Sequence, residues 1–376
     1  MKAETTFSLK DQLFNADKVA YLSGLITKVH PSFPSKTFQA DVVAKFPELE
    51  LKERMAHITD CLRQHLPDDY LVAVDILVKS LPPELDPDLK DDDFGDFIFA
   101  PLSLFVALHG CTEEYLDVSM EALKECTKRF SAEYAIRFFI NEFPEQTMAF
   151  LANQVDDRHY HVRRWASEGT RPKLPWAQAL TIEYREPLPL LDALFFDNTR
   201  FVTRSVANHL NDISKLAPDL VVETLKRWQA SEKQDPKEMA FITKHSLRTL
   251  VKQGHAEALE LLGFPSQPDV EIAELRTTTP EVKVGDAFEF TLVLISNTTQ
   301  NLMVDYVMEF ATSGKRARTK VFKLKQIKAK ADNSYTLAKK HKMKLMTTRR
   351  LDLGTHTITL QINGQTYDSL SFELVE

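Results

Sequence analysis

The sequence repeats a pattern of residue types with a period of 40 residues. Cations recur at this spacing, at Lys124, Arg164, Arg204 and Lys244. An apolar residue stands two places before each of them, and a small or medium-sized residue stands two places after. Such a period with an apolar column is typical of stacked helical repeats, because each repeat buries its apolar face against the next. The period therefore predicts a solenoid with one cation per repeat along one edge.

The two parts of the chain differ in their hydrophobic periodicity. Up to about residue 265, apolar residues recur three and four places apart, and prolines separate the segments, as expected for short helices. Beyond Gly263, short alternating segments rich in Val, Ile, Thr and Phe are separated by turn signals such as Asn363-Gly364. We predict a mainly α chain, with a HEAT-like helical-repeat solenoid in residues 1–265. Six or seven strands in residues 269–376 predict an immunoglobulin-like β-sandwich.

Charge is unevenly distributed along the chain. The net charge is −7, but residues 301–350 hold 14 Lys and Arg against three acidic residues, a local charge of +11. The remainder carries −18. This asymmetry favours a localised anion-binding surface. The alternative is a set of strands whose lysines are merely solvated.

Several classes of protein are excluded by composition. The three cysteines are scattered and form no Cys-x-x-Cys pair, so neither a disulfide framework nor a zinc site is indicated. The N-terminus lacks a run of signal-peptide character, and no segment approaches 18 uncharged apolar residues. We expect a cytoplasmic protein without a cofactor. The acidic stretch Asp86–Asp96 is interpreted as a solvated loop that includes Asp91, Asp92 and Asp93.

Residues 156–172 contain the greatest variety of chemically active side chains. Asp157, Val162 and Arg163 have the spacing seen in HEAT repeats, where aspartates and arginines form a ladder between neighbouring repeats. Upstream, Asp117 and Glu121 belong to a row of carboxylates four residues apart, which share one face of a helix. That row is either a solvated acidic face or the source of a carboxylate that faces a cationic substrate.

The segments HYHVRRWASEGTRPKLPW (159–176), FVTRSVANHLNDISKLAPDLV (201–221) and KHSLRTLVKQG (244–254) resemble the AlkC type of DNA alkylation-repair glycosylase. FIFAPLSLFVALHG (97–110) also resembles that family, which belongs to the AlkC/AlkD superfamily of HEAT-like-repeat proteins. The resemblance implies excision of cationic N3-alkylated bases from duplex DNA in base excision repair. It implies 3-methyladenine as the chief substrate, 3-methylcytosine as a further candidate, and removal without base flipping.

The resemblance also suggests roles for individual residues. Glu121 is the expected catalytic carboxylate with Asp157 as its rival, and Trp165 would hold the cationic sugar or base by cation–π contact. A carboxylate would stabilise an oxocarbenium-like sugar and activate water. The residues expected to bind DNA are Lys124, Arg163, Arg164, Arg171, Arg204, Lys244, His245 and Arg248.

Other features are interpreted as structural. Trp176 and Trp228 are expected to be core anchors, because tryptophans at helical spacing usually pack inside. Asn208, Asn211 and Asp212 are expected to cap or cross-link helices rather than contact DNA. We expect a monomer, since a groove open to duplex DNA needs no second subunit. A non-catalytic HEAT-repeat adaptor that binds nucleic acid or an acidic protein remains the alternative function.

Overall fold

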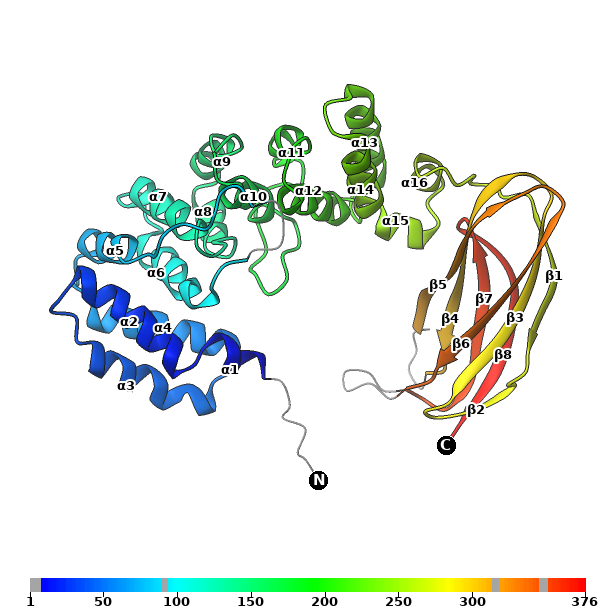
Figure 1. Cartoon of the computed structure of the whole chain (residues 1–376), viewed down its shortest axis with the longest axis horizontal. Coiled ribbons are helices and arrows are strands. Elements are labelled where there is room, and N and C mark those ends of the chain that lie inside the picture. Colours follow the sequence, from blue (N-terminus) through cyan, green and yellow to red (C-terminus); the bar gives the residue numbers. More distant parts are fainter. Residues whose placement is uncertain (1–7, 90–93, 313–317, 345–350) are drawn as a thin grey trace. The chain divides into compact units, whose positions relative to one another are not determined.

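The computed structural model describes residues 8–89, 94–312, 318–344 and 351–376 (Figure 1). The chain divides into two compact units. One unit contains the chain up to Ile213 together with Trp228–His245, and the other contains Ser214–Arg227 together with the chain from Ser246 onward. Within the described ranges, no helix is long and apolar enough to cross a membrane. Asp91, Asp92 and Asp93 of the predicted acidic loop lie outside the described residues.

The described chain before residue 262 forms helices joined by short connections. The α-helices are α1 (Leu9–Leu13), α2 (Ala16–Val29), α3 (Ser35–Lys45), α4 (Leu51–His65), α5 (Tyr70–Lys79), α6 (Ala100–Gly110), α7 (Leu116–Thr127), α8 (Ile136–Glu142), α9 (Pro144–Ala152), α10 (Tyr160–Glu168), α11 (Leu188–Leu194), α12 (Arg200–Ile213), α13 (Pro218–Ser231), α14 (Pro236–Ser246), α15 (Arg248–Gln253) and α16 (Ala256–Leu261). Single 3-10 turns occupy Phe46–Glu48 and Phe97–Phe99. Side-chain caps define several helix starts, as where Asn15 accepts a hydrogen bond from the backbone N–H of Lys18.

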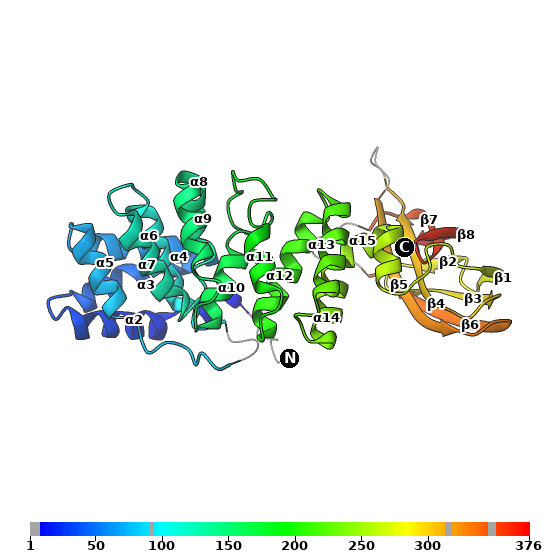
Figure 2. The same cartoon turned by 90° about the horizontal axis from the view of Figure 1, so that it is seen from above.

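The 40-residue period corresponds to four helices of the stack. The apolar positions Ala122, Val162, Val202 and Ile242 lie on α7, α10, α12 and α14, and all four are buried. These helices follow one another in chain order (Figure 2). The small residues at positions 126, 166, 206 and 246 are buried as well. The predicted solenoid core is therefore confirmed.

Ion pairs connect successive repeats. Asp157 accepts the Lys124 ammonium at 2.8 Å, and Asp197 accepts the Arg163 guanidinium at 2.5 Å, so each aspartate binds a cation of the preceding repeat. The same carboxylates accept backbone N–H groups at the starts of α10 and α12, from His159 at 2.8 Å and from residue 199 at 2.7 Å. This is the structural ladder that the spacing of Asp157 and Arg163 allowed.

The second unit contains a β-sandwich. Its strands are β1 (Val270–Thr277), β2 (Glu281–Lys283), β3 (Ala287–Ser296), β4 (Gln300–Phe310), β5 (Arg318–Ala329), β6 (Asn333–Lys342), β7 (Gly354–Ile362) and β8 (Gln365–Val375). They form a three-stranded sheet in the order β1-β3-β6 and a five-stranded sheet in the order β2-β8-β7-β4-β5. The strands are antiparallel except where β2 pairs with β8. Apolar side chains from both sheets form one core, which includes Phe288, Leu292, Tyr306, Leu360 and Phe372.

Two of these strands are absent from the sequence prediction. β2 is only three residues long, and β6 has the lysine-rich sequence NSYTLAKKHK with Leu337 as its one buried apolar residue. Both are edge strands, as is β5. Charged edges prevent pairing with other chains, so edge strands have a weak hydrophobic pattern. Lysines 320, 323, 325 and 328 of β5 are exposed, whereas Lys315, Arg316, Arg349 and Arg350 lie outside the described residues.

Two glycines meet backbone to backbone within the second unit. Gly254 ends α15 with φ 74°, and Gly364 lies in the β7–β8 turn with φ 82°. A Cβ added to Gly364 would lie 2.4 Å from the Gly254 Cα. Neither backbone can give way without separating α15 from the sandwich.

We expect Gly364→Ala to lower the free energy of unfolding of this unit by about 2–3 kcal/mol, because steric overlap adds to the positive φ. Gly285→Ala is the matched control, since its φ of 101° is also positive but its Cβ would meet nothing within 4 Å. That variant should lose only about 1 kcal/mol. Urea unfolding followed by far-UV circular dichroism measures both, and equal losses would show that the contact has no energetic importance.

Candidate active site

A cavity of about 950 Å³ lies in the first compact unit, which we call the helical unit and which contains the chain up to Ile213 together with Trp228–His245. Aromatic side chains form much of its wall, namely Phe94, Phe97, Phe130, Tyr134, Phe138, Trp176 and Phe201. The carboxylates among its lining residues are Glu133 and Glu168, and the cations are Lys52, Arg164, Arg171 and Arg204. This volume and composition suit a site for a planar, partly charged ligand group.

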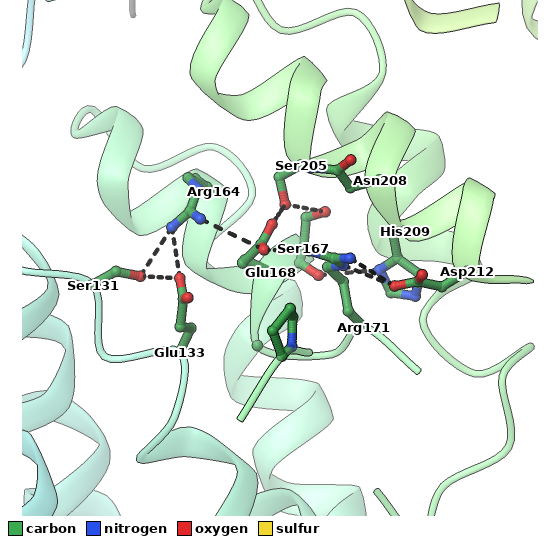
Figure 3. A network of polar contacts seen from close by, with 12 residues as sticks. Ser131, Glu133, Arg164, Ser167, Glu168, Arg171, Ser205, Asn208, His209 and Asp212 are labelled. Atoms are coloured by element: carbon green, nitrogen blue, oxygen red, sulfur yellow. Dashed lines mark hydrogen bonds and ion pairs between the residues drawn. The ribbon is translucent and has the colours of Figure 1, made fainter. Parts of the chain in front are cut away.

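Arg164 connects the two carboxylates (Figure 3). Its guanidinium lies 2.8 Å from Glu133 and 3.6 Å from Glu168, and it donates to the Ser131 hydroxyl at 3.0 Å. The guanidinium also lies 4.5 Å from the centroid of the Phe201 ring. The side chain is buried. Arg164 therefore forms part of the cavity wall, where it binds two carboxylates, and it does not belong to an exposed row of cations.

Glu168 is the most completely held carboxylate of the cavity. Its Oε1 lies 2.6 Å from the Arg171 guanidinium, and its Oε2 accepts a hydrogen bond of 2.6 Å from Ser205. Burial raises the pKa of Glu168, but the guanidiniums of Arg164 and Arg171 and the hydroxyl of Ser205 lower it by more. The result is a buried anion whose pKa lies below its ordinary value and whose position is fixed by three neighbours.

A second layer of contacts holds Arg171. Asp212 on α12 accepts two hydrogen bonds from its guanidinium, at 3.0 and 2.8 Å. Nearby, His209 donates its Nδ1–H to the Ser167 carbonyl at 3.0 Å, and burial lowers the pKa of its imidazole to about 4. The imidazole is therefore neutral at pH 7. Asp212 has the cross-linking role predicted from the sequence, because it connects α12 to the segment that follows α10.

The structure separates the carboxylates that the sequence favoured from the cavity. Glu121 and Asp117 are exposed on α7, and neither lines the cavity. Asp157 is engaged by Lys124 in the ladder. Trp165 has no exposed surface and packs edge-on against Phe150, with centroids 6.2 Å apart. Its ring cannot face a sugar from that position, because α10 turns it into the core.

The predicted DNA-binding cations also differ in their surroundings. Lys124 and Arg163 belong to the ladder, and Arg164 and Arg171 hold the cavity carboxylates. The expected row of four phosphate-binding cations is thus interrupted at Lys124 and Arg164, whose charges are matched by carboxylates. The others are half-buried or exposed, namely Arg204 on the cavity wall, Lys244 and His245 on α14, and Arg248 on α15. His245 lies 2.8 Å from the Asn208 amide oxygen.

The two tryptophans predicted to be core anchors behave differently. Trp228 is buried, stacks on Phe195 with centroids 4.6 Å apart, and donates to Asp192 at 2.7 Å. Trp176 is 64% exposed and lies at the cavity. The prediction for Trp176 is wrong because this residue lies in the loop between α10 and α11, where helical spacing places no constraint on its side chain.

Sequence reasoning missed Glu133 and Glu168. A signal for Glu168 was present, because it follows Arg164 by four residues, the spacing of neighbours on one helix face, and precedes Arg171 by three. Glu133 lies in the turn before α8 and has no comparable signal. No group of three or more His, Cys, Asp or Glu side chains in the described residues is arranged to hold a metal ion.

Comparisons with known proteins agree with this architecture. Residues 271–376 match a family model described as the C-terminal Ig-like domain of the uncharacterised protein YhaZ. The chain is 30% identical over 367 residues to the uncharacterised protein YhaZ of Bacillus subtilis (strain 168), covering 96% of this chain and 98% of that protein. It is also similar to the structure of Pseudomonas fluorescens alkylpurine DNA glycosylase AlkC bound to DNA containing an abasic site analog. That match has a TM-score of 0.86, 32% identity, and coverage of 98% of this chain and 100% of the other. The chain therefore belongs to the AlkC family.

Proposed function

We propose that this protein is a DNA glycosylase that releases cationic N3-alkylated bases from duplex DNA. The chief substrate would be 3-methyladenine, with 3-methylcytosine as a second one. The observation that carries the proposal is Glu168, an ionised carboxylate buried in the wall of an aromatic cavity. Burying an anion costs free energy, and the guanidiniums of Arg164 and Arg171 together with the Ser205 hydroxyl offset that cost here. The similarity to an alkylpurine DNA glycosylase over nearly the whole chain supports the proposal.

The chemistry of the substrate matches this arrangement. An N3-alkylated base is already cationic, so its glycosidic bond is weak and the leaving base needs no proton. The enzyme has to stabilise the oxocarbenium-like sugar and provide a water for C1′. A carboxylate fixed beforehand performs the first task by its charge and the second as a general base. We assign both tasks to Glu168, and we assign to Arg164 and Arg171 the role of orienting it.

The aromatic wall suits a cationic nucleotide. Faces of Phe, Tyr and Trp attract cations by about 0.5–2 kcal/mol each. Following the family resemblance, we propose that the deoxyribose enters the cavity while the base is not flipped out. A duplex with 2-aminopurine beside the lesion tests this point, because its fluorescence stays quenched as long as the base stack is intact. A large rise on binding would show that the base is extruded.

A base-release assay on methylated DNA tests the function itself. We expect the purified protein to free 3-methyladenine, identified by chromatography, from DNA treated with a methylating agent. DNA binding without release of any base would instead support the non-catalytic adaptor. Release of only uncharged bases such as hypoxanthine would contradict the assigned chemistry, because such bases need an acid to protonate them.

The lysines of β5 are expected to bind DNA phosphates. Replacing Lys323, Lys325 and Lys328 with Gln should reduce the slope of log K against log salt by about one per lysine that contacts a phosphate. The slope is measured by fluorescence anisotropy with a labelled duplex at salt concentrations from about 50 to 200 mM. Lys79→Gln is the control, since Lys79 forms an exposed pair with Asp75. An unchanged slope would mean that the β5 lysines are simply solvated.

A further inference from the structure

The loop that follows α10 presents Trp176 at the cavity in an unusual backbone conformation. Trp176 has φ 67°, in the left-handed region that bulky residues rarely adopt. Such a conformation persists only where the surroundings fix it. The contacts that stabilise this backbone conformation therefore indicate the role of the loop.

Side chains from the helical unit bind the carbonyls of this loop one after another. Tyr134 donates to the Pro175 carbonyl at 2.8 Å, and Lys52 donates to the Trp176 carbonyl at 2.9 Å. Arg137 donates to the carbonyl of residue 178 at 2.8 Å, and Asn141 to that of residue 179 at 3.0 Å. Four of the five carbonyls from 175 to 179 are thus bound by side chains.

Three of these four donors come from α8 and the turn before it. Arg137 and Asn141 are four residues apart and share one face of α8, and Tyr134 lies in the turn two residues before that helix. Arg137 is buried and also donates to the carbonyls of Gly169, at 3.0 Å, and Arg171, at 2.8 Å. Asn141 additionally accepts the backbone N–H of residue 181 at 2.9 Å. Tyr134 and one face of α8 therefore bind carbonyls at both ends of the segment 169–179.

We propose that Tyr134, Arg137 and Asn141 form a positioning clamp, which sets Trp176 against the DNA at the mouth of the cavity. This inference rests on the proposed glycosylase function. An exposed aromatic ring on a rigid loop offers a stacking surface for a nucleotide at no further cost in chain entropy. Arg137 joins this surface to the catalytic wall, because it binds the loop and the carbonyls on both sides of residue 170. The clamp thereby fixes the distance between the stacking surface and Glu168.

Asn141→Ala tests the clamp with little risk to the fold, because Asn141 is only partly buried and does not line the cavity. We expect kcat for base release to fall about tenfold, since small misplacements of positioning groups cost that much or more. KM and the melting temperature should change little. Asn153→Ala, at an exposed position after α9, should leave all three unchanged.

A double-mutant cycle shows whether Asn141 acts through Trp176. In a Trp176→Ala background, Asn141→Ala should reduce kcat by less than twofold, because the group that it positions is gone. Full additivity of the two losses would overturn the proposal. A loss of melting temperature that accompanies the loss of kcat would also count against it, since it would indicate a purely structural role.

Intrinsic fluorescence tests the clamp without reference to catalysis. Trp165 and Trp228 are almost fully buried, so acrylamide quenching reports mainly on Trp176. A duplex with a tetrahydrofuran abasic analogue should shield Trp176 in the wild type, lowering the quenching constant at least twofold. Heparin, a polyanion without bases, should not. In Asn141→Ala, the anisotropy of the emission should fall because the loop is released. If the wild type releases no base but shows the expected shielding and anisotropy, the proposed function is contradicted. The proposal of a clamp that positions Trp176 is then still supported.

Discussion

Glu168→Gln is expected to reduce base release by about 10²–10³-fold, which is the usual effect of removing one electrostatic stabiliser from a catalytic site. The substitution keeps the shape of the side chain but removes the negative charge to which we assign stabilisation of the oxocarbenium-like sugar. We expect the fold to survive, because Arg164 keeps Glu133 as a partner and Arg171 keeps Asp212. Affinity for a tetrahydrofuran duplex should change by less than a few-fold. Single-turnover release of 3-methyladenine measures the chemical step directly.

Glu121→Gln is the matched comparison, because Glu121 is an exposed carboxylate that the sequence favoured as the catalytic group. It should retain wild-type turnover. Loss of activity in Glu121→Gln alone would return the catalytic role to α7. The pH profile offers a second check. Because the pKa of Glu168 lies below its ordinary value and the substrate needs no proton, the rate should be flat between about pH 6 and 8.

Arg171→Leu should have the largest effect on stability, with a loss of about 3–5 kcal/mol in the free energy of unfolding at pH 7. Glu168 would lose its nearest cation, and Asp212 would lose the two hydrogen bonds that Arg171 donates. Removing one member of a buried ionic network leaves the buried charges of its partners less well compensated. Thermal or urea unfolding measures the loss. Lys79→Met, which breaks an exposed pair, should cost no more than about 0.5 kcal/mol.

The loss caused by Arg171→Leu should depend on pH in a definite direction. The folded-state pKa of Glu168 is depressed, so its ion pairs stabilise the wild type above the unfolded value of 4.5. That stabilisation disappears as the pH falls through the folded-state pKa. In Arg171→Leu, the Glu168 carboxyl can take up a proton more readily, and the neutral carboxyl needs no cation beside it. The difference between the two proteins should therefore shrink below about pH 5, and a difference that grows with acidity would contradict the assigned ion pairs.

Repeat architecture could be predicted because it depends on a local regularity. Val162, Val202 and Ile242 recur at one spacing because each occupies the same buried place in its repeat. The ladder of Asp157 and Arg163 was likewise visible as a spacing. The strand β6 was missed because an edge strand with lysines on its outer side has little hydrophobic alternation to detect.

The choice of carboxylate could not be predicted in the same way. Glu121 and Glu168 are both helical glutamates with cations nearby in the sequence. Residue spacing does not predict which of the two is buried among other side chains. The cavity is lined by residues of α4, α6, α8, α10 and α12, together with the loop that carries Trp176. Only contacts between these distant segments bury one glutamate and leave the other in solvent.

The sequence by itself determined the helical repeats, the change to β-structure and the family, because these depend on periodicity and on motifs that are local in the chain. The tertiary structure decided which charges are used inside the protein and which remain available to a ligand. Arg164 illustrates the difference, since it belongs to a periodic column of cations and yet is buried against Glu133 and Glu168. Electrostatic energy depends on distance and on exclusion of water, and both are properties of the packed repeats rather than of residue spacing.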